Sequence, residues 1–125
     1  MKDIETRADL EALLKQFYKS LLADDSINYI FIDVAKMDLE EHLPVITDFW
    51  EVSLFHTGNY RNNPMQVHMD LNQKEKLTAA HFATWLWHFE ATTDKLFAGP
   101  NAEKIKTRAQ SIATVMQIKL SGSGY

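Results

Sequence analysis

Apolar residues spaced three and four apart recur in four stretches of this chain, and this pattern constrains the fold more than any other feature. The spacing places apolar side chains on one face of a helix, and that face must be buried against another element. The stretches cover residues 10–21, 39–54, 82–97 and 102–120. Only four Gly and three Pro occur, which favours long regular elements with short connections. We therefore predict an all-α domain of four long amphipathic helices with one further short helix.

The length and composition exclude several classes of protein. A chain of 125 residues fits a single domain spanning residues 1–125, with residues 121–125 expected as a flexible tail. The net charge of −4 gives no reason to expect nucleic acid or an anionic membrane as a partner. The absence of cysteine excludes disulfides, thiolate catalysis and iron–sulfur clusters. No apolar run approaches the roughly 20 residues that span a bilayer, and the N-terminus lacks a signal-peptide core, so we expect a cytoplasmic protein.

Polar residues with capping potential precede each stretch and predict where the helices begin. The expected caps are Thr6, Asp38, Thr78 and Asn101. Pro44 conflicts with the second stretch, because an interior proline removes a helix hydrogen bond. Either that helix begins near Glu41, with Pro44 in its first turn, or it kinks there. The apolar patch at residues 27–32 has no neighbouring strand pattern, so we interpret it as a short helix or turn.

Three side chains with polar groups fall on the apolar stripes of three different helices: Tyr18, His42 and Trp85. Each has an ordinary structural explanation. The Tyr18 hydroxyl can bond a nearby carbonyl, since buried phenols usually find a partner. His42 can cap the start of its helix, and Trp85 can be a simple core residue. Taken singly, none of them indicates a functional site.

A fourth candidate, His68, follows the helix-breaking pair Asn63-Pro64. Asn63 is a good N-cap and proline suits the first helical position, so a short helix carrying His68 among apolar neighbours is predicted. On spacing alone, a core histidine bonded to a carbonyl is the favoured explanation. His56 is expected to be exposed and has no assigned role, and residues 81 and 88, both histidines, are expected to be partly solvated.

The four candidates together suggest a chemistry that none suggests alone. A simple helical bundle does not normally bury Tyr18, His42, His68 and Trp85 all at once, so a shared polar spot within an apolar pocket explains them better. No repeated Glu-x-x-His pair, His-Glu-x-x-His zinc motif or glycine-rich phosphate loop occurs. One neutral imidazole, an apolar envelope and a few donors are what a haem pocket requires.

An ordered set of short motifs resembles the truncated haemoglobins, the short two-over-two globins of bacteria, and specifically their third group. The resemblance covers roughly residues 4–120, and the paired-glycine motifs of the first two groups are absent. The matching pieces are Phe17-Tyr18, Ile30-Phe31, Glu41-His42, Ile46, Phe49-Trp50, Thr57-Gly58-x-Tyr60, Pro64-Met65-x-x-His68, Leu71, Phe82-x-x-Trp85-Leu86 and Arg108-Ala109-x-x-Ile112-Ala113.

The resemblance implies a two-over-two helical sandwich around a pocket for haem b, which would be held without covalent attachment because cysteine is absent. It implies that His68 is the proximal iron ligand. The distal side is implied for Tyr18, His42 and Trp85, with Ile46 and Phe31 as its walls. His42 is also a candidate iron ligand when no other ligand is bound. Tyr60 and Arg61 are candidates for contact with a haem propionate.

The implied function is binding of oxygen, nitric oxide, carbon monoxide or cyanide at the iron, with an unidentified reductase as partner. A second interpretation is an enzyme, either a nitric oxide dioxygenase or peroxidase-like, because three distal donors would polarise an O–O bond. A third is a helical interaction module without cofactor. The visible spectrum of the purified protein distinguishes the third interpretation from the other two.

Overall fold

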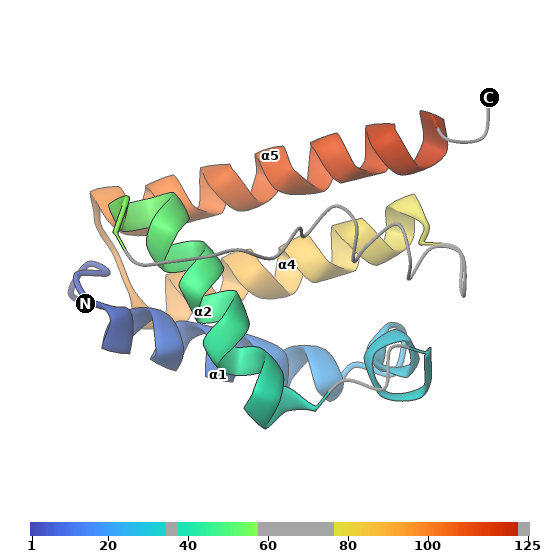
Figure 1. Cartoon of the computed structure of the whole chain (residues 1–125), viewed down its shortest axis with the longest axis horizontal. Coiled ribbons are helices and arrows are strands. Elements are labelled where there is room, and N and C mark those ends of the chain that lie inside the picture. Colours follow the sequence, from blue (N-terminus) through green and yellow to red (C-terminus); the bar gives the residue numbers. More distant parts are fainter. Residues whose placement is uncertain (35–37, 58–76, 123–125) are drawn as a thin grey trace.

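The computed structural model describes residues 1–34, 38–57 and 77–122. No strand occurs among them, which confirms the predicted all-α class. Their elements are α1 (Arg7–Leu22), a π-helical turn η1 (Ile30–Val34), α2 (Leu39–Phe55), α4 (Ala79–Leu96) and α5 (Pro100–Gly122) (Figure 1). None of the helices in this part of the chain is long and apolar enough to cross a membrane.

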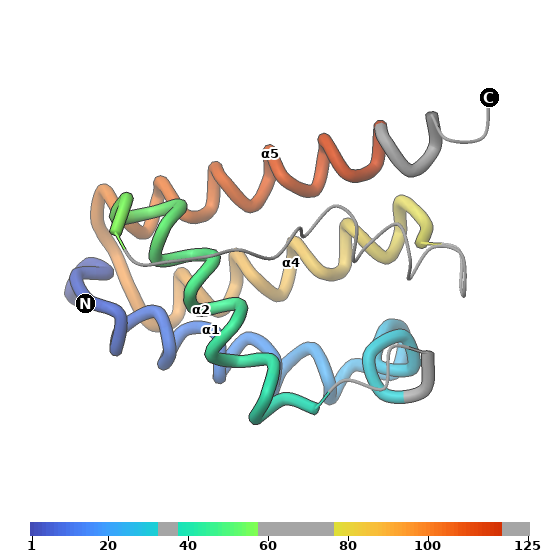
Figure 2. Tube along the Cα trace, viewed as in Figure 1, coloured from blue at the N-terminus to red at the C-terminus, as the bar shows by residue number. Residues whose placement is uncertain are grey.

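The long helices form two layers of two. In one layer α2 crosses α1, and in the other α4 and α5 run antiparallel beside each other, as Figure 2 shows. Contacts between α1 and α4 join the layers, and α2 also contacts α5. The predicted two-over-two sandwich is therefore confirmed.

Aromatic rings fill the interface between α1 and α4. The Phe17 ring lies at the centre, with ring centroids of Tyr18, Trp85 and Phe89 at 4.9, 5.7 and 5.2 Å. All three contacts are edge-to-face, the geometry that aromatic quadrupoles favour. The predicted α1 stripe is buried along its whole length: Leu10, Leu13, Leu14, Phe17, Tyr18 and Leu21. Burial of this stripe is what holds α1 against both of its neighbours.

The helix starts agree with the expected caps at three of four positions. Thr6 accepts a hydrogen bond from the backbone N–H of Asp9, and the Asp9 carboxylate accepts one from the backbone of Thr6. Asp38 caps α2 and Thr78 caps α4. Each cap satisfies backbone donors that a helix start leaves without a partner.

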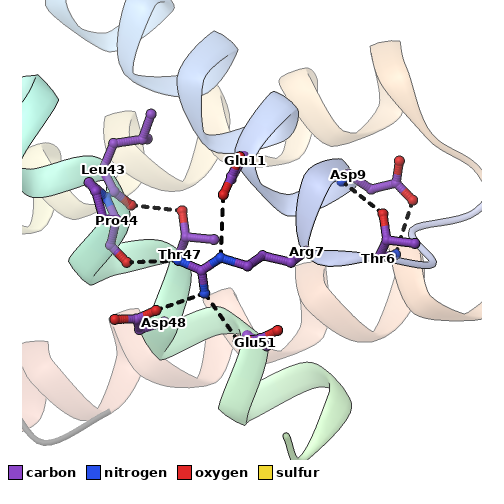
Figure 3. Close-up of polar contacts among 9 residues, drawn as sticks. All are labelled: Thr6, Arg7, Asp9, Glu11, Leu43, Pro44, Thr47, Asp48 and Glu51. Carbon is purple, nitrogen blue, oxygen red and sulfur yellow. Dashed lines mark hydrogen bonds and ion pairs between the residues drawn. The ribbon is translucent and has the colours of Figure 1, made fainter. Parts of the chain in front are cut away.

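Pro44 lies inside α2, because that helix begins at Leu39 and not near Glu41. Because proline has no backbone N–H, one hydrogen bond within the helix is missing at this position. Beside it, Arg7 of α1 donates to the Pro44 carbonyl at 3.5 Å and to Asp48 at 2.7 Å (Figure 3). A third bond from Arg7 reaches Glu51 at 3.1 Å, so one guanidinium joins α1 to three positions of α2.

The start of α5 differs from the prediction. The helix begins at Pro100, and Asn101 is not its cap. Instead the Asp3 carboxylate accepts hydrogen bonds from the backbone N–H groups of Asn101 and Ala102, at 3.0 and 2.9 Å. Gly99 has a φ of +144°, and a Cβ there would lie 2.5 Å from Asp3 Cγ, so only glycine fits. A residue from the far end of the chain thus supplies the cap.

Two smaller predictions can also be compared with the structure. The patch at residues 27–32 leads into the turn η1, in agreement with a short helical element. Helix α5 ends at Gly122, and the flexible tail expected at residues 121–125 stays a prediction. Residues 123–125 lie outside the described residues.

Candidate functional site

Tyr18 and His42 meet where α1 and α2 cross. Their hydroxyl oxygen and Nε2 are 3.0 Å apart, within hydrogen-bond distance, although the residues are 24 positions apart in sequence. Tyr18 is only 5% exposed. This pairing removes two of the ordinary explanations, because Tyr18 bonds a side chain and because Asp38, not His42, caps α2.

The surroundings of this pair are aromatic and apolar. The Phe31 ring of η1 packs edge-to-face with the Tyr18 ring, with the two ring centroids 6.4 Å apart. Ile46 is partly buried and packs against the same core. The Trp85 ring makes no direct ring contact with Tyr18 or His42. The Phe17 ring lies between Tyr18 and Trp85 and contacts both. The structure therefore brings together Tyr18, His42 and Phe31 directly, and connects Trp85 to them through one ring.

Burial raises the pKa of the Tyr18 phenol well above its ordinary value of 10.0. The hydroxyl accordingly stays protonated at neutral pH and can act as a donor. If Nε2 of His42 carries its proton, that N–H donates to the Tyr18 oxygen, and the phenolic hydrogen remains available for a third group. The pair can therefore present one neutral donor to a ligand without breaking its own bond.

Several predicted site residues cannot be placed. His68, Tyr60 and Arg61 lie outside the described residues, as do Pro64 and the predicted short helix. Within the described ranges, no group of three or more His, Cys, Asp or Glu side chains could hold a metal ion. A groove of about 470 Å³ between α1 and α2 is lined by other residues than the Tyr18–His42 pair: Glu11, Lys15, Leu39, Glu40, Leu43, Pro44 and Thr47.

Comparison with known proteins finds relatives in both sequence and structure. No protein-family model matches the chain. The group 3 truncated hemoglobin ctb of Campylobacter jejuni subsp. jejuni serotype O:2 is 29% identical over 108 residues, which cover 84% of this chain and 83% of that protein. The crystal structure of a group III truncated hemoglobin from Campylobacter jejuni superimposes with a TM-score of 0.84 at 27% identity, over 96% of this chain and 95% of the other. In both sequence and fold, the chain is similar to the group III truncated haemoglobins.

The structure contains a second polar cluster that the sequence analysis missed. His88 was expected to be partly solvated, and this is wrong, since it is only 6% exposed. Its Nδ1 lies 2.7 Å from the Ser20 hydroxyl and its Nε2 lies 2.7 Å from the Asp24 carboxylate. We call Ser20, Asp24 and His88 the His88 cluster. The adjacent Trp87 is 64% exposed. The position of His88 beside this residue was the reason why the sequence suggested solvation of His88.

Two further histidines, His56 and His81, agree with their predictions. His81 lies in the first turn of α4, where its Nδ1 accepts the Thr78 backbone N–H at 3.1 Å. Its Nε2 is 2.9 Å from the Tyr29 hydroxyl. His56 is exposed and ends α2 in a left-handed conformation with φ of 59°. Neither residue contacts the Tyr18–His42 pair through a hydrogen bond among the described residues.

The His88 cluster should make the free energy of unfolding depend on pH in the acidic range. Hydrogen bonds from His88 and Ser26 lower the pKa of Asp24 to about 2, below its ordinary value of 3.8. The unfolded chain then binds this proton first, so the contribution of Asp24 is present above about pH 4 and is lost as the pH falls toward 2. We expect Asp24→Asn to be less stable at pH 7 and to lose less stability between pH 5 and pH 2 than the wild type. Denaturant unfolding at each pH measures this.

Asp25→Asn is the matched control, because Asp25 is an exposed neighbouring carboxyl without a polar partner among the described residues. Its acid profile should follow that of the wild type. Equal pH profiles for Asp24→Asn and Asp25→Asn would contradict the role assigned to the Asp24–His88 bond.

Proposed function

We propose that this chain binds haem b and, through it, oxygen and other small ligands such as nitric oxide, carbon monoxide and cyanide. The observation that carries the proposal is the 3.0 Å pairing of Tyr18 with His42 inside an aromatic envelope, in a chain similar to the group III truncated haemoglobins. The relatives that match are named as hemoglobins. The apolar side chains suit the haem macrocycle, which needs an apolar envelope. The neutral donors suit a bound diatomic ligand, which accepts hydrogen bonds.

A bound haem would supply an iron centre on which a diatomic ligand becomes partly negative. The chain's own groups then act on that ligand. The Tyr18 hydroxyl, kept protonated by its burial, donates a hydrogen bond toward it. His42 holds the phenol in place through Nε2, and the Trp85 indole N–H is a second donor from α4. Ile46 and Phe31, which are partly buried against the same core, would wall this side of the pocket.

The opposite side of the pocket is proposed from the sequence motif Pro64-Met65-x-x-His68. A neutral imidazole on His68 would bind the iron, and its other ring N–H would need an acceptor such as a backbone carbonyl. Tyr60 and Arg61, shortly before it, are proposed for the propionates, since a guanidinium pairs readily with a carboxylate.

Titration of the purified apoprotein with haemin tests the proposal. We expect saturation at one haemin per chain, a sharp visible absorption band, and spectral changes on adding dithionite and then carbon monoxide. Tryptophan fluorescence should fall in the same titration, because Trp50 and Trp85 both lie in the aromatic core. A protein that stays colourless at every haemin concentration would instead favour an interaction module without cofactor.

A second candidate function is an enzyme that carries out redox chemistry on the ligand, as a nitric oxide dioxygenase or a peroxidase-like protein. The observation in its favour is that two donors, Tyr18 and Trp85, both contact the Phe17 ring, with His42 bonded to the first. Several donors polarise an O–O bond more than one does. Nitric oxide consumption by the oxygen-loaded protein under an added reducing system, measured against free haemin, distinguishes this candidate from simple binding.

A further inference from the structure

We propose that the His88 cluster is a positioning device for the distal pocket: it holds α4 against α1 so that Trp85 and Tyr18 can donate to the same ligand. This inference rests on the proposed function. The cluster has no contact with the Tyr18–His42 pair through a hydrogen bond in the described chain, so its influence would act through the placement of the two helices.

The contacts of His88 fix its ring in one orientation. A carboxylate can only accept, so Nε2 of His88 carries a proton and donates it to Asp24 at 2.7 Å. In the neutral ring Nδ1 then accepts from the Ser20 hydroxyl, also at 2.7 Å. Rotation of the imidazole would break both bonds at a site that is 6% exposed, where water cannot replace them easily.

Asp24 is itself held in place from its other side. Its Oδ1 accepts from the Ser26 backbone N–H at 2.9 Å and from the Ser26 hydroxyl at 2.7 Å. The Oδ2 atom is the one that accepts from His88. The cluster therefore ties the last turn of α1 and the following turn to the middle of α4.

The cluster lies about one helical turn from the contact between Phe17 and Trp85. Ser20 follows Phe17 by three residues on α1, and His88 follows Trp85 by three residues on α4. Residues three apart are neighbours on a helix surface, about 4.5 Å along its axis. Phe17 touches both Tyr18 and Trp85, so the spacing of the two donors depends on how α1 and α4 pack at this point.

The cluster is not suited to act as a nucleophile of the Ser-His-Asp kind. Ser20 lies in the last turn of α1, where a helix presents carbonyl groups and not the N–H donors that stabilise an oxyanion. The imidazole is also buried, which leaves no room for a substrate between it and the serine. A polar cluster with every nitrogen satisfied and no access instead rigidifies its surroundings.

Two variants of the haem-loaded protein test the inference. Ser20→Ala removes one bond of His88, and His88→Leu removes both while keeping an apolar side chain of similar bulk. We expect oxygen release to become roughly two- to tenfold faster in Ser20→Ala, which loses one hydrogen bond, and at least as fast again in His88→Leu, which loses two. The carbon–oxygen stretching band of added carbon monoxide should broaden or split, since it responds to where the donors lie.

Lys106→Ala is the matched control, because it breaks an ion pair of 2.6 Å with Asp94 that ties α4 to α5 and not to α1. It should lower the thermal midpoint without changing the stretching band. Tyr18→Phe is the positive control and should shift the band strongly. If that shift occurs while Ser20→Ala and His88→Leu keep the wild-type band and release rate, the positioning role is wrong; if Tyr18→Phe also leaves the band unchanged, the proposed distal pocket itself is wrong.

Discussion

Replacing His68 with alanine should abolish tight haem binding, because His68 is the proposed proximal ligand of the iron. Removing an outer-shell partner of a metal ligand typically lowers metal affinity by about 10- to 100-fold. The loss of haem affinity in His68→Ala should be larger than this. Haemin titration followed by transfer of haem to an apo-globin acceptor measures both affinity and retention. Added imidazole should restore a coordinated spectrum in His68→Gly, since it can occupy the vacated position.

The other histidines are the controls for this experiment. His56→Ala and His81→Ala should keep the wild-type spectrum, because one is exposed and the other is committed to the start of α4. His42→Ala should retain haem but change the ferric spectrum if His42 binds iron in the absence of another ligand. Loss of haem in His81→Ala with a normal spectrum in His68→Ala would transfer the proximal role to α4.

Tyr18→Phe should accelerate oxygen release by roughly 10- to 150-fold, since a hydrogen bond to a charged acceptor contributes about 1.5–3 kcal/mol and about 1.4 kcal/mol corresponds to a factor of ten. Trp85 and His42 can compensate in part, which favours the lower end of this range. Carbon monoxide release should change much less, because that ligand is far less polar. Stopped-flow measurement with both ligands gives the comparison directly.

Tyr29→Phe provides a matched control for Tyr18→Phe. It removes the same hydroxyl from another tyrosine–histidine pair, Tyr29 with His81, whose bond is 2.9 Å long. Oxygen release should stay close to the wild-type rate in this variant. A large acceleration in Trp85→Phe, with Tyr18→Phe unchanged, would instead make the indole of α4 the principal donor.

Local sequence was sufficient to predict most of the fold. The spacing of apolar residues predicted the buried stripe of α1, and short polar side chains predicted the caps Thr6, Asp38 and Thr78. These features depend only on residues within one or two helical turns, which is why a linear pattern contains them. The same reasoning placed Tyr18 inside the protein before any partner was known.

The prediction of the site was less complete. The sequence indicated that Tyr18 and His42 each face inward, but it did not show that their polar atoms are 3.0 Å apart. It also gave two alternatives for Pro44, and the observed start of α2 at Leu39 excludes the one in which that helix begins near Glu41. Distances between helices depend on how their faces pack, and that information is not local.

What the sequence alone determined is thus the set of helices and the face that each one buries. Only the tertiary structure decided which distant groups satisfy one another. His88 is buried because Ser20 and Asp24 reach it from 68 and 64 residues away, and α5 is capped by Asp3 from 98 residues away. The physical reason is that a polar group can be buried when a partner offsets the loss of water, and such a partner can come from any part of the chain.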